Sequence, residues 1–176
     1  MNKRGIILYG PPASGKDTIT QALHQRDSTF VQFKRLKYGV GRTTGYRMIS
    51  HKELEEVRNR GDVLWENSRY DSTYVVDRDY LLEQAHKGHI PVVHLGQTEA
   101  VCSVIKGAPL KWTVVELICP RDAAQQRIIA RQTGDTDARL AAYDSTERLS
   151  NPDLVIDTST VKPDEAADLI IAAQDQ

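Results

Sequence analysis

The sequence predicts an α/β fold in which helices cover both faces of a parallel β-sheet. Short apolar runs alternate with segments of helical pattern along most of the 176 residues, and this alternation is typical of βαβ units with right-handed crossovers. The expected strands are Gly5–Tyr9, Ile90–Leu95, Thr113–Cys119 and Leu154–Ile156. The expected helices are Lys16–His24, His51–Arg60, Asp77–His86, Thr98–Ile105, Ala123–Arg131 and Pro163–Ala173.

The expected strands are nearly continuous apolar runs, which favours burial on both faces of a parallel sheet. The helical segments separate these strands, and Pro163 suits the first turn of the last helix. Residues 30–76 and 132–150 fit the alternation poorly. Because irregular insertions on an α/β scaffold usually cover the ligand, we expect these two segments to form a substrate module and a lid.

The composition is ordinary, with 40% hydrophobic and 27% charged residues, and the length suits one domain with a substantial core. The formal net charge of −1 argues against a general nucleic-acid or membrane partner. No apolar run approaches the roughly 20 residues of a membrane helix, and the first ten residues are not expected to form a signal peptide. Cys102 and Cys119 are predicted to be buried, reduced thiols, as expected of a cytoplasmic protein.

The strongest motif lies between the first strand and the first helix. Residues 10–16 have the spacing Gly-x-x-x-x-Gly-Lys of a phosphate-binding loop. Its glycines let backbone N–H groups turn inward around phosphate oxygens, the helix adds its positive N-terminal end, and Lys16 reaches the β and γ phosphates. The predicted ATP-binding residues are Gly10, Pro11, Pro12, Ala13, Ser14, Gly15, Lys16, Asp17 and Thr18.

Asp17 occupies the position where this motif usually carries serine or threonine to hold a magnesium ion. A carboxylate is a good Mg²⁺ ligand, directly or through a water. Thr18 offers a hydroxyl one residue further along the helix. We therefore predict Mg²⁺ as the cofactor, with Asp17 and Thr18 as its candidate ligands. A tolerated, solvent-facing helix residue is the alternative interpretation of Asp17.

Residues 31–50 form a basic segment without a single Asp or Glu. Glycines and the tyrosines Tyr38 and Tyr46 lie among its charges. Because arginine forks and tyrosine hydroxyls match phosphate oxygens well, this segment predicts a second anion site for a phosphate monoester. A solvated charge run is the alternative. The five basic residues are Lys34, Arg35, Lys37, Arg42 and Arg47.

The stretch "TTGYRMISHKELEEVRNRGDVLWENSRYDSTYVVD" resembles the acceptor module of guanylate kinases. In that family a Gly-x-Asp-Tyr-x-Phe-Val-Ser segment leads into a short helix, then Gly-x-Phe-Leu-Glu-Trp and a Tyr-Gly-Thr turn. Tyr46 and Ser50 match the tyrosine and serine of the first segment. Gly61 matches the glycine of the second, and Tyr74 matches the tyrosine of the turn.

The C-terminal half is similar to the same family. "PRDAAQQRIIARQTGDTDARLAAYDSTERL" is similar to its Arg-x-x-x-Arg helix and arginine-bearing lid, and "LVIDTSTVKPDEAADLI" to its last strand and helix. The resemblance implies a three-layer P-loop kinase fold forming a single domain over residues 1–176. Its expected parts are a core (1–30, 77–131 and 151–176), an acceptor module (31–76) and a lid (132–150).

The resemblance also implies an activity, which is transfer of the γ-phosphate of ATP to a nucleoside monophosphate. This chemistry needs positioning and charge neutralisation more than covalent catalysis. ATP and a phosphorylated small-molecule acceptor are thus the predicted partners. The predicted catalytic residues are Lys16, Arg127, Arg131 and Arg139. The predicted acceptor-binding residues are Arg35, Arg42, Tyr46, Trp65, Glu66 and Tyr74.

The sequence departs from the family where guanine is recognised. Trp65 stands in place of the base-reading glutamate, and Val76 replaces a base-reading hydroxyl. Glu66 and Asn67 are the candidate substitutes if the turn shifts by one residue. The family's Asp-x-Asp is missing from the strand that ends at His94 and Leu95, and His94 is interpreted as a satisfied strand-end histidine. Ribose 1,5-bisphosphate kinases share this pattern. A sugar-phosphate kinase and a non-catalytic domain that binds phosphorylated ligands therefore remain alternatives.

Overall fold

The computed structural model describes residues 3–69 and 71–175. Its centre is a five-stranded parallel sheet with the strand order β2-β7-β1-β8-β9. β1 lies in the middle of this sheet, so the segment that follows it leaves from the centre of the carboxyl edge. The five strands are β1 (Arg4–Tyr9), β2 (Phe30–Gln32), β7 (Ile90–Leu95), β8 (Lys111–Ile118) and β9 (Leu154–Asp157).

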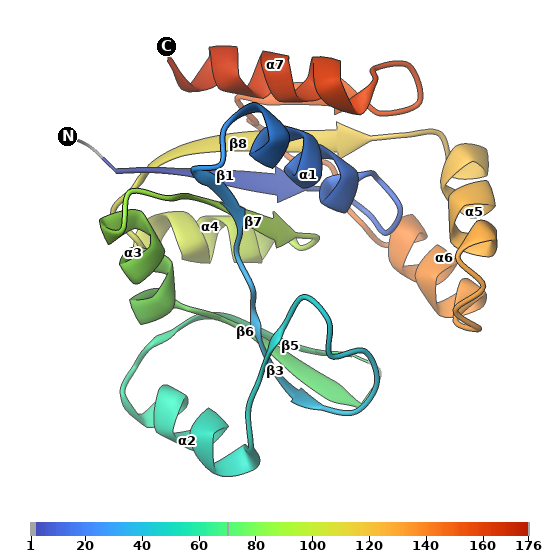
Figure 1. The fold of residues 1–176 in the computed structure, drawn as a ribbon. Coiled ribbons are helices and arrows are strands. Elements are labelled where there is room, and N and C mark those ends of the chain that lie inside the picture. Colours follow the sequence, from blue (N-terminus) through green and yellow to red (C-terminus); the bar gives the residue numbers. More distant parts are fainter. Residues whose placement is uncertain (1–2, 70, 176) are drawn as a thin grey trace.

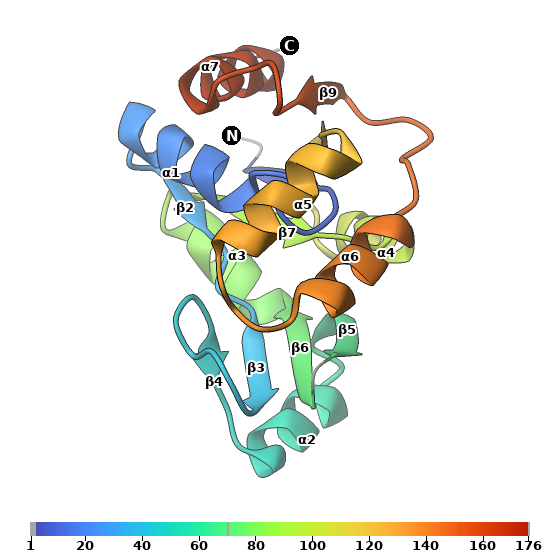
Figure 2. The same cartoon turned by 90° about the vertical axis from the view of Figure 1, so that its right-hand side faces the viewer.

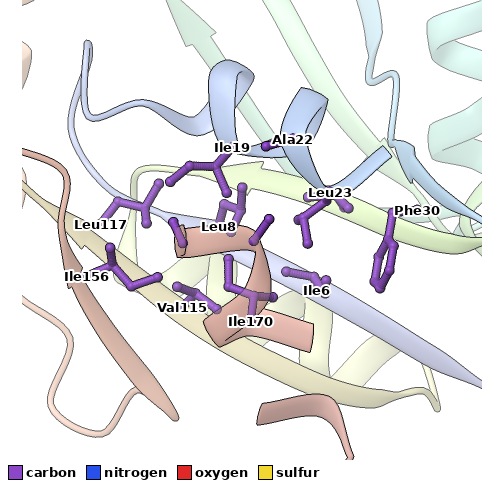
Figure 3. Close-up of a cluster of buried hydrophobic side chains, with 13 residues drawn as sticks. Ile6, Leu8, Ile19, Ala22, Leu23, Phe30, Val115, Leu117, Ile156 and Ile170 are labelled. Atoms are coloured by element: carbon purple, nitrogen blue, oxygen red, sulfur yellow. The ribbon is translucent and has the colours of Figure 1, made fainter. Parts of the chain in front are cut away.

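Helices cover both faces of the sheet (Figure 1). α1 (Lys16–Arg26) and α7 (Pro163–Gln174) lie on one face, and α3 (Arg78–His86) and α4 (Thr98–Gly107) lie on the other. The first pair encloses a buried cluster that includes Leu8 of β1, in the middle of the group, and Leu117 of β8 (Figure 3). A second buried cluster lies beneath α3 and α4. Burial on both faces explains why these strands are nearly continuous apolar runs.

A second, smaller sheet projects from the main sheet on the side opposite α7, as both views show (Figures 1 and 2). Its strand order is β4-β3-β6-β5. α2 (His51–Asn59) covers its outer face, where Leu54 and Val57 of the helix form a buried cluster with Leu36 and Val75 of the sheet. Ser50 caps this helix in a capping box with Glu53. The four strands are β3 (Leu36–Gly39), β4 (Arg47–Met48), β5 (Val63–Arg69) and β6 (Ser72–Asp77).

α5 (Arg121–Ala130) and α6 (Thr136–Asp144) form a helical pair beyond the carboxyl edge of the main sheet (Figure 2). Arg121 joins them through a two-pronged ion pair with Asp144, with distances of 2.7 and 2.9 Å. Tyr143 anchors α6 by donating its hydroxyl proton to the Cys119 carbonyl at 2.6 Å. The loop 131–135 between the helices turns at Gly134, whose φ is 76°.

The predicted α/β fold with helices on both sheet faces is confirmed, and the four predicted strands and six predicted helices all form. Three features were not predicted: β2, the four-stranded small sheet and α6. β2 continues to Gln32, so the main sheet extends into the segment predicted as the acceptor module. Cys119 is buried as expected, but Cys102 is exposed, which corrects the prediction for that thiol. In the described residues, no helix is both long and apolar enough to cross a membrane.

Candidate functional site

A cavity of about 830 Å³ lies at the carboxyl edge of the main sheet, between the small sheet and the α5–α6 pair. This is where ligands bind in open α/β sheets. Its walls come from the loop after β1, the basic segment 31–50, the end of β7 and the loop 131–135. Three segments far apart in the sequence, residues 10–17, 35–46 and 131–139, therefore face the same space.

The loop after β1 has the geometry of a phosphate cradle. Gly15 has a φ of 95° and Ala13 a φ of 62°, so the chain turns tightly before α1 begins. Gly10 is enclosed, because a Cβ there would lie 2.6 Å from the Leu117 carbonyl oxygen and 2.8 Å from the Ser14 hydroxyl. A larger residue at position 10 would therefore displace the loop. The N-terminus of α1, with its unpaired N–H groups, opens directly onto the cavity.

Lys16 folds back over this loop. Its ammonium group donates to the carbonyls of Gly10 (2.6 Å) and Pro11 (2.8 Å) and to the Ser14 hydroxyl (3.3 Å). Burial is the main cause that lowers the pKa of Lys16 to about 7; the Asp17 carboxylate opposes this shift, and the guanidinium groups of Arg35 and Arg131 contribute to it. Without a ligand, the ammonium is thus a high-energy cation close to the place where phosphates would bind.

This pKa gives a testable pH dependence for nucleotide binding. A bound polyphosphate favours the charged ammonium, so binding raises the pKa of Lys16 above its free value of about 7. At pH values below about 7, Lys16 is charged both in the free protein and in the complex. Above about 7 it is neutral in the free protein, so nucleotide binding must be accompanied by the uptake of one proton. The affinity for metal-free ADP should therefore fall by up to about tenfold per pH unit above pH 7. Calorimetry in buffers of different ionisation enthalpy measures the uptake, and an unchanged affinity without proton uptake would contradict this assignment.

Asp17 and His94 face each other on the floor of the cavity. The Nδ1 atom of His94 lies 3.7 Å from a carboxylate oxygen of Asp17, and both residues line the cavity. Burial lowers the pKa of His94 to about 3, aided by the positive charges of Lys16 and Arg35, so the ring is neutral at ordinary pH. Thr18, the second predicted metal ligand, is exposed and does not line the cavity. Asp17 is therefore the better placed of the two.

The basic segment forms a cluster of cations and tyrosine rings, which we call the basic–aromatic cluster: Arg35, Lys37, Arg42, Tyr46 and Tyr74. All five line the cavity. The Tyr46 and Tyr74 rings lie 5.3 Å apart, and Arg35 and Lys37 each lie within 6 Å of both ring centres. Cations held over aromatic faces are fixed in position and remain able to bind an anion.

Lys37 is the residue of this cluster that the sequence-based assignment of acceptor residues left out. It is only 2% exposed, and its ammonium group donates to the Arg42 carbonyl at 2.8 Å. Within residues 3–69 and 71–175 it forms no ion pair. Arg47, by contrast, pairs with the buried Asp77 and stacks on Tyr80, so it has a structural role.

The structure places the candidate base-reading residues of β5 differently from the sequence-based prediction. Asn67, opposite Tyr74, lines the cavity, and its Oδ1 atom is buried without a hydrogen-bond partner among the described residues. Glu66 points to the other face of the sheet, where it pairs with Arg58 of α2 at 3.0 Å. Trp65 packs against the core cluster beneath α3 and α4, outside the cavity lining. Of the two candidate substitutes for the base-reading glutamate, Asn67 faces the cavity and Glu66 does not.

The three predicted catalytic arginines occupy different places. Arg131 and Arg139 line the cavity, and Arg139 pairs with Asp135 at 2.7 Å. Arg127 lies behind the phosphate loop, where it donates to the carbonyls of Ala13 (3.0 Å) and Thr158 (2.8 Å). Arg131 is the C-cap residue of α5, directly after the last helical residue Ala130. In this conformation Arg127 supports the loop from outside the cavity.

The central strand, the phosphate loop and the helix that follows it define the class of fold: a parallel α/β protein of the P-loop kinase type. No protein-family profile matches the sequence. No curated protein sequence matches it significantly.

Solved structures are similar to the whole chain. Guanylate kinase from Anaplasma phagocytophilum is 14% identical with a TM-score of 0.63, covering 99% of this chain and 88% of that chain. The Mycobacterium tuberculosis APS kinase, solved with AMPPNP and APS, is 14% identical with a TM-score of 0.61 and covers 100% of both chains. A sugar kinase from Janibacter is 13% identical with a TM-score of 0.57, covering 98% and 95%. At these identities the similarity establishes the fold.

Proposed function

We propose that this protein is a kinase that transfers the γ-phosphate of ATP to a small molecule that already carries a phosphate group. The observation that carries the proposal is that one cavity contains both a phosphate cradle with Lys16 and a separate basic–aromatic cluster. A nucleotide-binding protein without an acceptor needs only the first. Its structural neighbours include a guanylate kinase and an APS kinase, which act on different acceptors. This range supports the general reaction.

The residues divide by role along the cavity. The phosphate loop and Lys16 would hold the β and γ phosphates, and the basic–aromatic cluster would hold the phosphate of the acceptor. Arg131 and Arg139 lie on the lid side, where they could neutralise charge on the transferring group. Asp17 would hold a divalent cation such as Mg²⁺, which would lower the charge of the nucleotide phosphates. The chain's own contribution is to position the reactants and exclude water.

A nucleoside monophosphate is the first candidate acceptor, because the small sheet carries the tyrosines that resemble those of guanylate kinases. A sugar phosphate with a second phosphate group is the other candidate. Arg35, Lys37, Arg42 and Arg69 all line the cavity, which is more positive charge than one phosphate monoester requires. Glu66 is directed away from the cavity and cannot read a base. The excess of cations is the observation that favours the second candidate, whereas the orientation of Glu66 argues only against guanine recognition by that residue.

An acceptor screen tests the proposal. Turnover with ATP and Mg²⁺ is compared for GMP, AMP, dTMP, CMP and ribose 1,5-bisphosphate at steady state. We expect one or more of these to stimulate ATP consumption and to be phosphorylated, with poor discrimination among bases. A site with buried base-reading groups would discriminate by about 10⁴. A preference for GMP above about a thousandfold would contradict the position of the base pocket, and no phosphorylated product from any acceptor would contradict the kinase assignment.

The two tyrosines offer a moderate test of the acceptor site. Tyr46→Phe and Tyr74→Phe each remove one hydroxyl while keeping the ring that faces Arg35 and Lys37. A lost hydrogen bond to a charged phosphate costs about 1.5–3 kcal/mol. The KM for the acceptor should therefore rise about tenfold or more, with a smaller change in the KM for ATP. Equal changes for both substrates would show that these rings only pack against each other.

A further inference from the structure

Asn67 lies on the acceptor side of the cavity, and its side chain has no hydrogen-bond partner. It lines the cavity from β5, and its Oδ1 atom is buried. Within residues 3–69 and 71–175, neither the oxygen nor the nitrogen of the amide takes part in a hydrogen bond. Buried polar groups are nearly always paired, and an unpaired one destabilises the folded state. An unpaired amide in the wall of a cavity therefore points to a bound ligand.

The register of the small sheet places Asn67 beside the residues that would hold the acceptor phosphate. Tyr74 of β6 lies opposite Asn67 on one side and opposite Lys37 of β3 on the other. Residues opposite one another in neighbouring strands point to the same face of a sheet, and all three line the cavity. Neighbouring strands are about 4.8 Å apart, so the row spans roughly 10 Å from Lys37 to Asn67. A phosphate held near Lys37 and Tyr74 leaves the far end of this row to the rest of the acceptor.

The amide of Asn67 is able to turn toward a ligand. The torsion about the Cβ–Cγ bond of asparagine has a broad range of accessible angles, and no hydrogen bond fixes it here. A ligand that donates to Oδ1 also ends the unpaired burial of this oxygen. Glu66, the preceding residue, is by contrast held on the other face of the sheet by Arg58.

An amide and a carboxylate select different base edges. A carboxylate has only hydrogen-bond acceptors, so it matches two donors side by side, and guanine offers such a pair in N1–H and N2–H. An amide has one acceptor beside its donors. It therefore matches a base edge with a donor next to an acceptor, and every common base has one: N6–H and N1 of adenine, N4–H and N3 of cytosine, N3–H and O4 of thymine, and N1–H and O6 of guanine.

We propose that Asn67 contacts the base of a nucleoside monophosphate acceptor, and that its neutral amide makes the site tolerant of different bases. The inference rests on the proposed function, because it requires a phosphorylated acceptor in this cavity. The unpaired amide is the observation that favours a nucleoside monophosphate over a sugar phosphate. Asn67 is thus the specificity-determining residue of the acceptor site, next to the residues that bind the phosphate.

Asn67→Asp tests the proposal, because it keeps the size of the side chain and replaces the amide with two acceptors. We expect the ratio of kcat/KM for GMP to kcat/KM for AMP to rise about tenfold or more, since only guanine offers two adjacent donors. The ratio is the measured quantity, because the added charge weakens every phosphorylated acceptor and this common effect cancels. A ratio within about threefold of the wild-type value would overturn the proposal.

Two further variants accompany this test. Asn59→Asp is the matched control, because Asn59 is the exposed last residue of α2 and lies outside the cavity lining. It should leave the ratio unchanged. Asn67→Ala introduces no charge and removes both hydrogen-bonding groups, so kcat/KM for each nucleoside monophosphate should fall about tenfold, with little change in the KM for ATP. Full activity of Asn67→Ala on every acceptor would also overturn the proposal.

Binding measurements separate this inference from the proposed function. With a non-hydrolysable ATP analogue bound to the phosphate loop, calorimetry gives the Kd for GMP and for AMP in the wild type and in Asn67→Asp. A shift in the ratio of these Kd values without turnover of any acceptor would keep the role of Asn67 and reject the kinase. Turnover with an unchanged ratio, or phosphorylation of ribose 1,5-bisphosphate and of no nucleoside monophosphate, would reject the role of Asn67 and keep the kinase.

Discussion

Replacing Lys16 with alanine is expected to lower kcat by about 10²–10³ while leaving the fold intact. Lys16 is the cation at the N-terminus of α1, and its three hydrogen bonds to the loop show that the ammonium already lies over the phosphate cradle. Losing a charged group that acts on the transferring phosphate in a desolvated site removes stabilisation that water does not replace. The measurement is single-turnover and steady-state phosphorylation of the best acceptor from the screen.

The unfolding temperature of Lys16→Ala should change little, because the variant removes a buried ammonium along with the desolvation cost of its charge. Lys106→Ala is the matched control: Lys106 is exposed in the last turn of α4, away from the cavity. It should retain full activity. Turnover of Lys16→Ala within tenfold of the wild type would contradict the kinase assignment itself.

The phosphate loop could be predicted from the sequence because it is encoded locally. A strand, a Gly-x-x-x-x-Gly-Lys spacing and a helix occupy neighbouring residues, so no long-range information is needed to join them. The apolar strands of the main sheet could also be predicted, because burial on both faces makes each of them an uninterrupted run of apolar residues. β2 is only three residues long and has too little pattern to recognise.

The acceptor side depends on register, which the sequence does not show. A β-bulge between Val63 and Trp65 shifts the pairing of β5 with β6 by one residue, and a one-residue shift moves every side chain to the opposite face. Glu66 consequently faces α2, and Asn67 faces the cavity. Alternation from Asn67 would also have indicated Arg69, which shares its face and lines the cavity. The contacts of His94 with Thr20 and Asp17 could not be predicted from the sequence, because both residues lie far from it along the chain.

Lys37 is a buried ammonium group among the candidate acceptor-binding residues. A buried ammonium group is costly unless it is paired, and this one has a single carbonyl acceptor and two aromatic neighbours. Structural ion pairs elsewhere in the small sheet, such as Arg47 with Asp77, are complete without any ligand. A buried cation without an ionic partner is suited to bind an external anion. Such a group is retained for function although it lowers the stability of the fold.

Lys37→Met is therefore expected to raise the KM for the acceptor by about tenfold to a hundredfold, the effect of losing a charged contact worth about 1.5–3 kcal/mol. The KM for ATP should change much less. The unfolding temperature should not fall, because methionine fills similar space without a buried charge. Lys34→Met is the matched control: it makes the same change three residues earlier, at an exposed position outside the cavity lining. If Lys37→Met lowered the unfolding temperature and affected both substrates equally, Lys37 would be a structural residue of the small sheet, and the anion site would have to depend on Arg35 and Arg42 alone.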